Sequence, residues 1–335
     1  MKLEQETKSY IKMSDDHKEN IEREFQRMEG ETKKTNLGKV DIAVPAGGVR
    51  RDDPEVQRLN DIAGYHNLPL EDLPSKGRFY RDDFRISIRS ASTKEIREWS
   101  TLDENNIRDI DEKLNSILTS CVKIQFGAQR GSYKDFLEED RLYVILRIKE
   151  LTYKDGENKL MMPVKGRNCP TSTCKSQTAE ELRTDNIQFQ DEHETIGKYY
   201  DFENRCYSVQ TKNHGTITLS PPNIGVMRAV TTYIGERESD GLGWDKSTLM
   251  MLPYMIREWR GLTAKEIFSA VTQLEGLNRD KFNLMYRLIE MIKVGIKPEF
   301  EYKCKDCGAE VTVPLTFPGG IKALFVVSDI SSELL

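Results

Sequence analysis

Apolar residues recur along this chain with two periods, and the alternation between the periods predicts a fold of the α+β class. Phe84–Arg89 alternates apolar and polar side chains, which is typical of a half-buried strand. Residues 107–118 instead place their apolar side chains on one helical face, with Asn105 or Asn106 before them as an N-cap. Leu137–Tyr153 contains a helix that is apolar almost all round, so we expect it at the centre of the core.

The second part of the chain repeats this order of strands followed by helices. Cys206–Gln210 and Thr216–Leu219 alternate around a Lys-Asn-His-Gly turn, which predicts a β-hairpin. The helices expected after it begin behind Pro221 and Pro222 and cover a stretch through Ile234, then Trp244–Trp259, Thr263–Leu274 and Asn278–Val294. We therefore expect two related helix-and-sheet halves over residues 70–200 and 201–335, preceded by a charged arm and linker over residues 1–69.

A pair of cysteines near the C-terminus carries the strongest chemical signal. Cys304 and Cys307 lie at a tight turn between two strand-like stretches, and Gly308 follows the second cysteine. This Cys-x2-Cys-Gly pattern is typical of a zinc knuckle, whose glycine allows the chain to turn back at positive φ. One knuckle supplies two ligands, whereas a structural zinc ion needs four.

Cys169 and Cys174 form the only other close cysteine pair, with four residues between them. We predict that the two distant pairs close one tetrahedral zinc site and tie the two halves together. A closed site of four cysteines would be structural, because it leaves no coordination position open for a substrate. His193 and His214 are alternative ligands, although a histidine in a hairpin turn, such as His214, is more simply a solvent-facing turn residue.

Composition and charge narrow the function classes. The 335 residues have a formal net charge of −5, with 31% charged and 37% hydrophobic residues. The sequence offers no large basic patch, which argues against electrostatic capture of nucleic acid. No apolar run approaches the length of a membrane span, and the start lacks an apolar signal region, so we expect a cytosolic origin. In a reducing compartment, paired cysteines indicate a metal rather than disulfides.

Catalytic motifs are absent from the sequence: it has no phosphate loop, no Gly-x-Ser-x-Gly elbow and no His-Glu-x-x-His. Cys121 and Cys206 are interpreted as small buried apolar residues, because no nucleophile signature surrounds them. The acidic run Glu138–Asp140, followed by Arg141, is interpreted as a solvated helix start. We therefore expect a protein that is not an enzyme.

Several short motifs occur in a recognisable order: Leu73–Gly77 before an Ile-rich strand, a helix that ends in Ser120–Val122, a helix with Asp140–Leu142 and Leu146–Arg147, and Leu151–Tyr153 leading towards the first cysteine pair. A hairpin, a helix begun by prolines and a helix-rich segment then precede Cys-x2-Cys-Gly. Over residues 70–328 this order resembles that of the baseplate hub family of T4-type contractile-tailed phages. The first cysteine pair departs from the family by having four intervening residues instead of two, and residues 1–69 lie outside the resemblance.

The resemblance implies a structural or hub-assembly component of a contractile phage tail baseplate. Its partners would be other tail and baseplate proteins, and its location the virion tail baseplate or, during assembly, the host cytoplasm. The residues alone leave a second class open, which is a cytosolic zinc-ribbon protein that binds nucleic acid or a regulatory protein partner. A basic ribbon face studded with aromatic residues would favour that alternative, and the acidic net charge argues against its nucleic-acid form.

Overall fold

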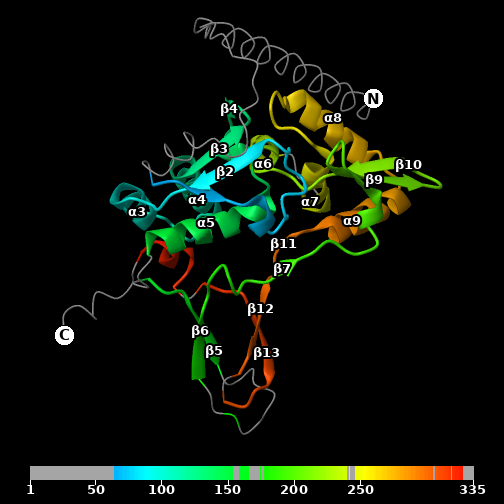
Figure 1. Cartoon of the computed structure of the whole chain (residues 1–335). Coiled ribbons are helices and arrows are strands. Elements are labelled where there is room, and N and C mark those ends of the chain that lie inside the picture. Colours follow the sequence, from blue (N-terminus) through cyan, green and yellow to red (C-terminus); the bar gives the residue numbers. More distant parts are fainter. Residues whose placement is uncertain are drawn as a thin grey trace, which may run out of the picture. The chain divides into compact units, whose positions relative to one another are not determined.

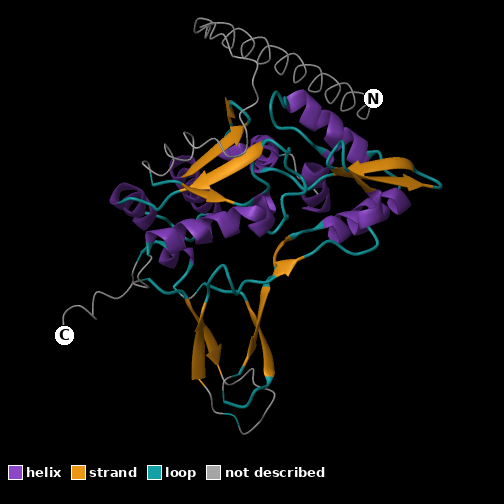
Figure 2. Cartoon of the chain, viewed as in Figure 1, coloured by secondary structure: helices purple, strands orange, loops and turns teal. Residues whose placement is uncertain are grey.

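The computed structural model describes residues 64–153, 158–165, 174, 177–239, 241, 246–304, 306–317 and 319–326 (Figure 1). The predicted N-terminal arm up to residue 63 and Cys169 lie outside these described residues. The described part contains seven α-helices and several small antiparallel sheets, which confirms the α+β class (Figure 2). None of the helices in this part has the length and apolar content needed to cross a lipid bilayer.

A four-stranded antiparallel sheet, in the order β1-β2-β3-β4, forms one side of the main core. Its strands are β1 (His66–Leu68), β2 (Phe84–Ile88), β3 (Val122–Phe126) and β4 (Gln129–Arg130). β2 is the strand that the alternating pattern predicts, and Phe84, Ile86 and Ile88 are almost completely buried. The sheet begins four residues before the predicted boundary at residue 70, because β1 pairs with β2.

Three helices pack with this sheet: α3 (Thr93–Ser100), α4 (Ile107–Cys121) and α5 (Glu138–Thr152). Ser92 caps α3 through a capping box with Glu95. The Asn106 side chain caps α4 by accepting the first backbone N–H groups of that helix. Val144 and Ile145 on α5 have no exposed surface, which confirms that this helix lies at the centre of the core.

A second hydrophobic core lies among the residues from 196 to 292. Its sheet has the order β10-β9-β8, and its helices are α6 to α9. The bounds are β8 (Tyr200–Asp201), β9 (Cys206–Thr211), β10 (Gly215–Leu219), α6 (Ile224–Ser239), α7 (Lys246–Met255), α8 (Ala264–Glu275) and α9 (Arg279–Ile292). β9 and β10 form the predicted hairpin, and their register runs from Thr211↔Gly215 to Tyr207↔Leu219.

The C-terminal segment returns to the first core. The short strands β7 (Phe189–Gln190) and β11 (Gly295–Ile296) pair, and the chain continues into β12 (Glu299–Lys303), β13 (Glu310–Pro314) and the 3₁₀ helix η5 (Ile321–Leu324). Phe300 and Phe325 are buried in the same cluster as α5. The Trp99 indole N–H donates to the Lys322 carbonyl at 3.1 Å, and the Tyr153 hydroxyl donates to the Phe325 carbonyl at 2.7 Å. The first core is therefore completed by residues from the end of the chain.

One segment differs from its predicted structure. Residues 175–200 are predicted as polar loop apart from a short strand near Phe189, but β6 (Gln177–Glu181) pairs along its whole length with β5 (Met161–Lys165). The β6 sequence Gln-Thr-Ala-Glu-Glu has little intrinsic strand preference. Its strand conformation therefore comes from pairing with β5, which periodicity alone does not reveal.

Candidate metal centre

Two β-hairpins carry the candidate ligands in their connections (Figure 1). β12 pairs with β13, and the connection between them contains Cys304 and Cys307. β5 pairs with β6, and the connection between them contains Cys174. Cys304, Cys307 and Cys174 therefore all lie in the connections at the ends of hairpins.

The turn after β12 has the backbone geometry of a knuckle. The Cys304 N–H donates to the Ala309 carbonyl and the Gly308 N–H donates to the Cys304 carbonyl, both at 2.8 Å. Gly308 has a φ of +70°, as the Cys-x2-Cys-Gly pattern predicts. A Cβ built on Gly308 would meet no atom within 4 Å, so glycine is favoured here by backbone conformation and not by lack of space.

Cys174, Cys304 and Cys307 converge. Their sulfur atoms all lie within 4.8 Å of one another, and the Cys174 and Cys304 sulfurs are 3.7 Å apart. In a tetrahedral zinc–thiolate site with Zn–S bonds of about 2.3 Å, neighbouring sulfurs are separated by about 3.8 Å. A disulfide would require about 2.05 Å. The three thiols are therefore spaced to hold a metal ion and not to form a covalent bond.

The three cysteines differ in their exposure to solvent. Cys304 is almost completely buried and belongs to the main core together with Val311 and Val313 of β13. Cys174 is half-buried and Cys307 is exposed. The cluster thus lies at the margin of the core, where a bound ion would join two segments 130 residues apart in the sequence.

Of the other predicted ligands, the two histidines lie outside the cluster. Cys169 falls outside the described residues, so its position relative to the cluster stays a prediction. The metal-ligand cluster found among the described residues contains neither His193 nor His214. The His193 ring contacts the Thr195 hydroxyl at 2.9 Å, and the His214 N–H donates to the Thr211 hydroxyl in the β9–β10 turn.

Cys121 at the end of α4 and Cys206 at the start of β9 are both almost completely buried, as predicted for small apolar residues. Burial raises the pKa of the Cys121 thiol to about 11 and also raises that of Cys206. Both thiols therefore stay protonated near neutral pH, which makes them poor nucleophiles and poor metal ligands.

Asp140 and Arg141 at the start of α5 are buried, so the interpretation of this run as a solvated helix start is wrong for these two residues. Asp140 has no exposed surface and accepts three hydrogen bonds. The Ser75 N–H donates to its Oδ1 at 2.8 Å, and the Ser75 and Tyr80 hydroxyls donate to its Oδ2 at 2.6 and 2.7 Å. Arg141 is also buried and binds Asp111, with Nη1 2.7 Å from Oδ1.

The physical reason for this difference lies in the rest of α5. A helix that is apolar almost all round has no solvated face, so charged residues in its first turn must find partners inside the protein. Burial raises the pKa of the Asp140 carboxyl to about 6, although the hydrogen bonds from Ser75 and Tyr80 oppose this rise. Burial raises the pKa of the Glu139 carboxyl further, to about 8. The missing solvated face is the sequence signal that could have identified both groups.

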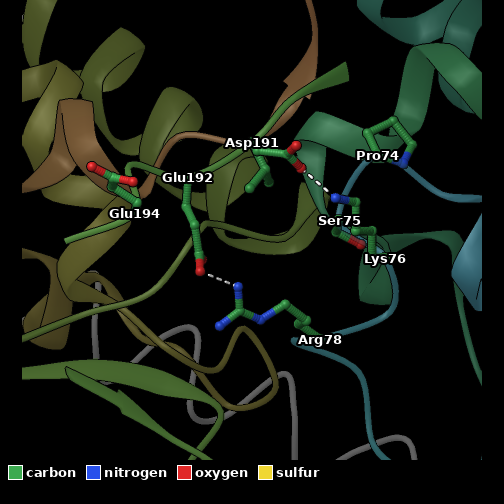
Figure 3. A pocket seen from close by; sticks show the side chains of 8 residues that line it. Pro74, Ser75, Lys76, Arg78, Asp191, Glu192 and Glu194 are labelled. Atoms are coloured by element: carbon green, nitrogen blue, oxygen red, sulfur yellow. Dashed lines mark hydrogen bonds and ion pairs between the residues drawn. The ribbon is translucent and has the colours of Figure 1, made fainter. Parts of the chain in front are cut away.

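The loop around Ser75 also contacts the chain that follows β7. Lys76 and Arg78 form ion pairs with Asp191 and Glu192 across a cavity of about 230 Å³ (Figure 3). The Lys76 and Asp191 side chains are mostly exposed, so their pair contributes little to stability, about 0–1 kcal/mol. The buried hydrogen bonds to Asp140 hold this loop, and the ion pairs add contacts between the loop and the segment after β7.

Comparison with known proteins adds nothing to the fold and the cysteine cluster as a basis for a functional statement. No family model matches the chain, and neither a search of curated proteins nor a search of solved structures gives a match.

Proposed function

We propose that this chain is a non-enzymatic structural or assembly component of the hub region of a contractile phage tail baseplate, stabilised by one structural zinc ion. The observation that carries the zinc part is the convergence of Cys174, Cys304 and Cys307 from two distant hairpins. Soft thiolates at tetrahedral spacing select zinc among the common divalent ions of a reducing compartment. Cys169 remains the predicted fourth ligand, five residues before Cys174.

The role of the zinc ion would be to hold the C-terminal hairpin against the β5–β6 hairpin. A structural zinc site contributes on the order of 10 kcal/mol to folding in small domains. Here β12 and β13 form a sheet of only two strands, and an isolated pair of strands is marginally stable in water. A metal crosslink at its tip would supply the stability that the pair lacks.

The hub assignment rests on the sequence resemblance, and one contact supports treating its motifs as a unit. Ser75 of the Leu73–Gly77 motif donates twice to Asp140 of the Asp140–Leu142 motif, across 65 residues of sequence. Two motifs that were recognised separately in the sequence thus depend on each other physically.

The hub proposal is tested in cells that produce a contractile phage tail. An affinity-tagged chain is expressed there, and complexes are isolated by the tag and separated by sedimentation. Association with baseplate subunits, before or after particle completion, is the expected result. A chain that sediments alone at every stage of assembly would contradict the hub proposal and would leave the zinc site untouched.

The alternative zinc-ribbon function is separated by a second measurement on the same protein. Electrophoretic mobility of single-stranded and double-stranded nucleic acid at low salt is expected to be unchanged by the chain, since its net charge is −5. Salt-dependent binding would instead favour the nucleic-acid function.

A further inference from the structure

A second cavity, of about 240 Å³, lies where the start of α5 meets α7 and α9. Its walls are mainly apolar and aromatic, formed by Met227, Met250, Met251, Tyr254, Tyr286 and Ile289. Met250 and Tyr286 are among the few large apolar side chains of the described residues that remain exposed, at 51% and 39%. The cavity is therefore open to solvent through an apolar rim.

A glutamate with a buried carboxyl oxygen lies in the wall of this cavity. Glu139 lines it, and its Oε1 accepts a hydrogen bond from the Tyr254 hydroxyl at 3.2 Å. Its Oε2 is buried and has no hydrogen-bond partner among the residues that the structure describes. A buried polar atom without a partner is unfavourable, so it indicates a place where a donor group can bind.

The neighbouring charges leave Glu139 as the group without a counter-ion. On its own helix Glu138 pairs with Arg141, and Asp140 is held by Ser75 and Tyr80. On α9 Glu290 pairs with Lys293 one turn later. From α7 the facing group is the uncharged Tyr254 hydroxyl. Among the described residues, the cavity thus presents three glutamates, of which Glu139 alone lacks an ion pair.

We infer that this cavity binds the side chain of a lysine presented by a partner polypeptide, with the ammonium group on Glu139 Oε2 and the alkyl stem between the methionines. Methionine side chains adapt to an inserted alkyl chain because they are unbranched and polarisable. Lysine is favoured over arginine because only one carboxylate oxygen is unpaired, whereas a guanidinium group is matched to both. The exposed rim of Met250 and Tyr286 would cover residues flanking that lysine.

The inference predicts a pH dependence. Burial, followed by Asp140 and Glu138, raises the pKa of Glu139 to about 8, so the empty site is mostly protonated at neutral pH. An ammonium group binds the ionised carboxylate, so binding must release a proton. About 1% of the Glu139 carboxyl groups are ionised at pH 6 and half at pH 8. The dissociation constant for a lysine side chain should therefore fall about 50-fold from pH 6 to pH 8.

The experiment uses the full chain with ¹³C-labelled methionine methyl groups. The signals of Met227, Met250 and Met251 are followed by NMR while N-acetyl-lysine methylamide is added. N-acetyl-norleucine methylamide lacks only the ammonium group, and N-acetyl-arginine methylamide carries a guanidinium group instead. The lysine probe is expected to bind at least tenfold tighter than either. Equal binding of the lysine and norleucine probes would overturn the role of Glu139.

Two variants and two further probes complete the test. Glu139→Gln is isosteric with the protonated acid, so it should fold as the wild type does and lose both the lysine preference and the pH dependence. Glu275→Gln, an exposed glutamate at the end of α8, is the matched control and should keep both. A short peptide with one central lysine between aromatic residues should bind at least tenfold tighter than pentan-1-amine. Equal affinities of these two probes would overturn a polypeptide as the occupant.

Discussion

Replacing Asp140 with alanine removes the acceptor that three buried donors share. The Ser75 N–H, the Ser75 hydroxyl and the Tyr80 hydroxyl all donate to this carboxylate, at 2.6–2.8 Å. Ser75 and Tyr80 are themselves buried, with 1% and 5% of their surface exposed. Bulk solvent therefore does not reach these donors.

The expected loss follows from these contacts. Each buried donor left without a partner costs about 1–3 kcal/mol, and local rearrangement of the hydroxyls recovers part of the sum. We expect Asp140→Ala to reduce the free energy of unfolding by about 3–6 kcal/mol. In the Ser75→Ala background one of the three donors, the Ser75 hydroxyl, is already gone, so Asp140→Ala should cost less there, with a coupling energy of about 1–3 kcal/mol.

The assay is urea unfolding followed by circular dichroism, for the wild type, both single variants and the double variant. Asp280→Ala is the control, because Asp280 lies in the first turn of α9 but is exposed. It tests the loss of a favourable helix-dipole interaction alone, about 0.3–1 kcal/mol. If Asp140→Ala costs no more than Asp280→Ala, the buried acceptor is not what holds the Leu73–Gly77 loop.

Three further predictions concern separate parts of the molecule. Glu139→Gln should raise the free energy of unfolding by about 3–5 kcal/mol at pH 9 and change it little at pH 4. The reason is that the pKa of Glu139 is about 8 in the folded protein, above its value in the unfolded chain, so the wild type loses stability as the pH rises through the folded pKa. Urea unfolding at both pH values checks this. Gly308→Ala should lower stability by about 1–2 kcal/mol through its positive φ, measured by thermal unfolding of the metal-loaded protein. Trp99→Phe should cost about 1 kcal/mol and speed proteolysis near Lys322, whose carbonyl loses its donor.

Local signals in the sequence account for much of the fold. Asn106 is a helix cap in the structure, as its position before an apolar-periodic stretch predicts, and Ser92 and Thr263 cap α3 and α8 from equivalent positions. The β9–β10 hairpin and the turn at Gly308 were likewise predictable, because both depend on residues close together in the chain. Capping, turns and amphipathic periodicity act within a few residues, so the sequence specifies them directly.

The features that could not be predicted depend on contacts between distant residues. β3 follows α4 without a breaker between Cys121 and Val122, since the change to a strand comes from pairing with β2. The return of Phe325 to the first core has no local signature. The burial of Asp140 likewise depends on Ser75, which is 65 residues away.

In the candidate site, too, local features could be predicted and contacts between distant residues could not. The spacing of Cys304 and Cys307 identified the knuckle, and the pairing of the remaining cysteines suggested Cys174 as a partner. Spacing alone could not establish that these sulfurs meet, because the two segments are 130 residues apart. The Glu139 carboxyl was missed altogether, since its environment is built by α7 and α9.

The most direct test of the zinc-stabilised fold is the metal content of the purified full chain, measured by elemental analysis after gel filtration without chelator. We predict about one zinc per chain, lost in Cys304→Ser and in Cys174→Ser and retained in Cys206→Ala, whose thiol is buried in β9 and is not part of the cluster. A chain without zinc, or a zinc content that all three substitutions leave unchanged, would contradict the account.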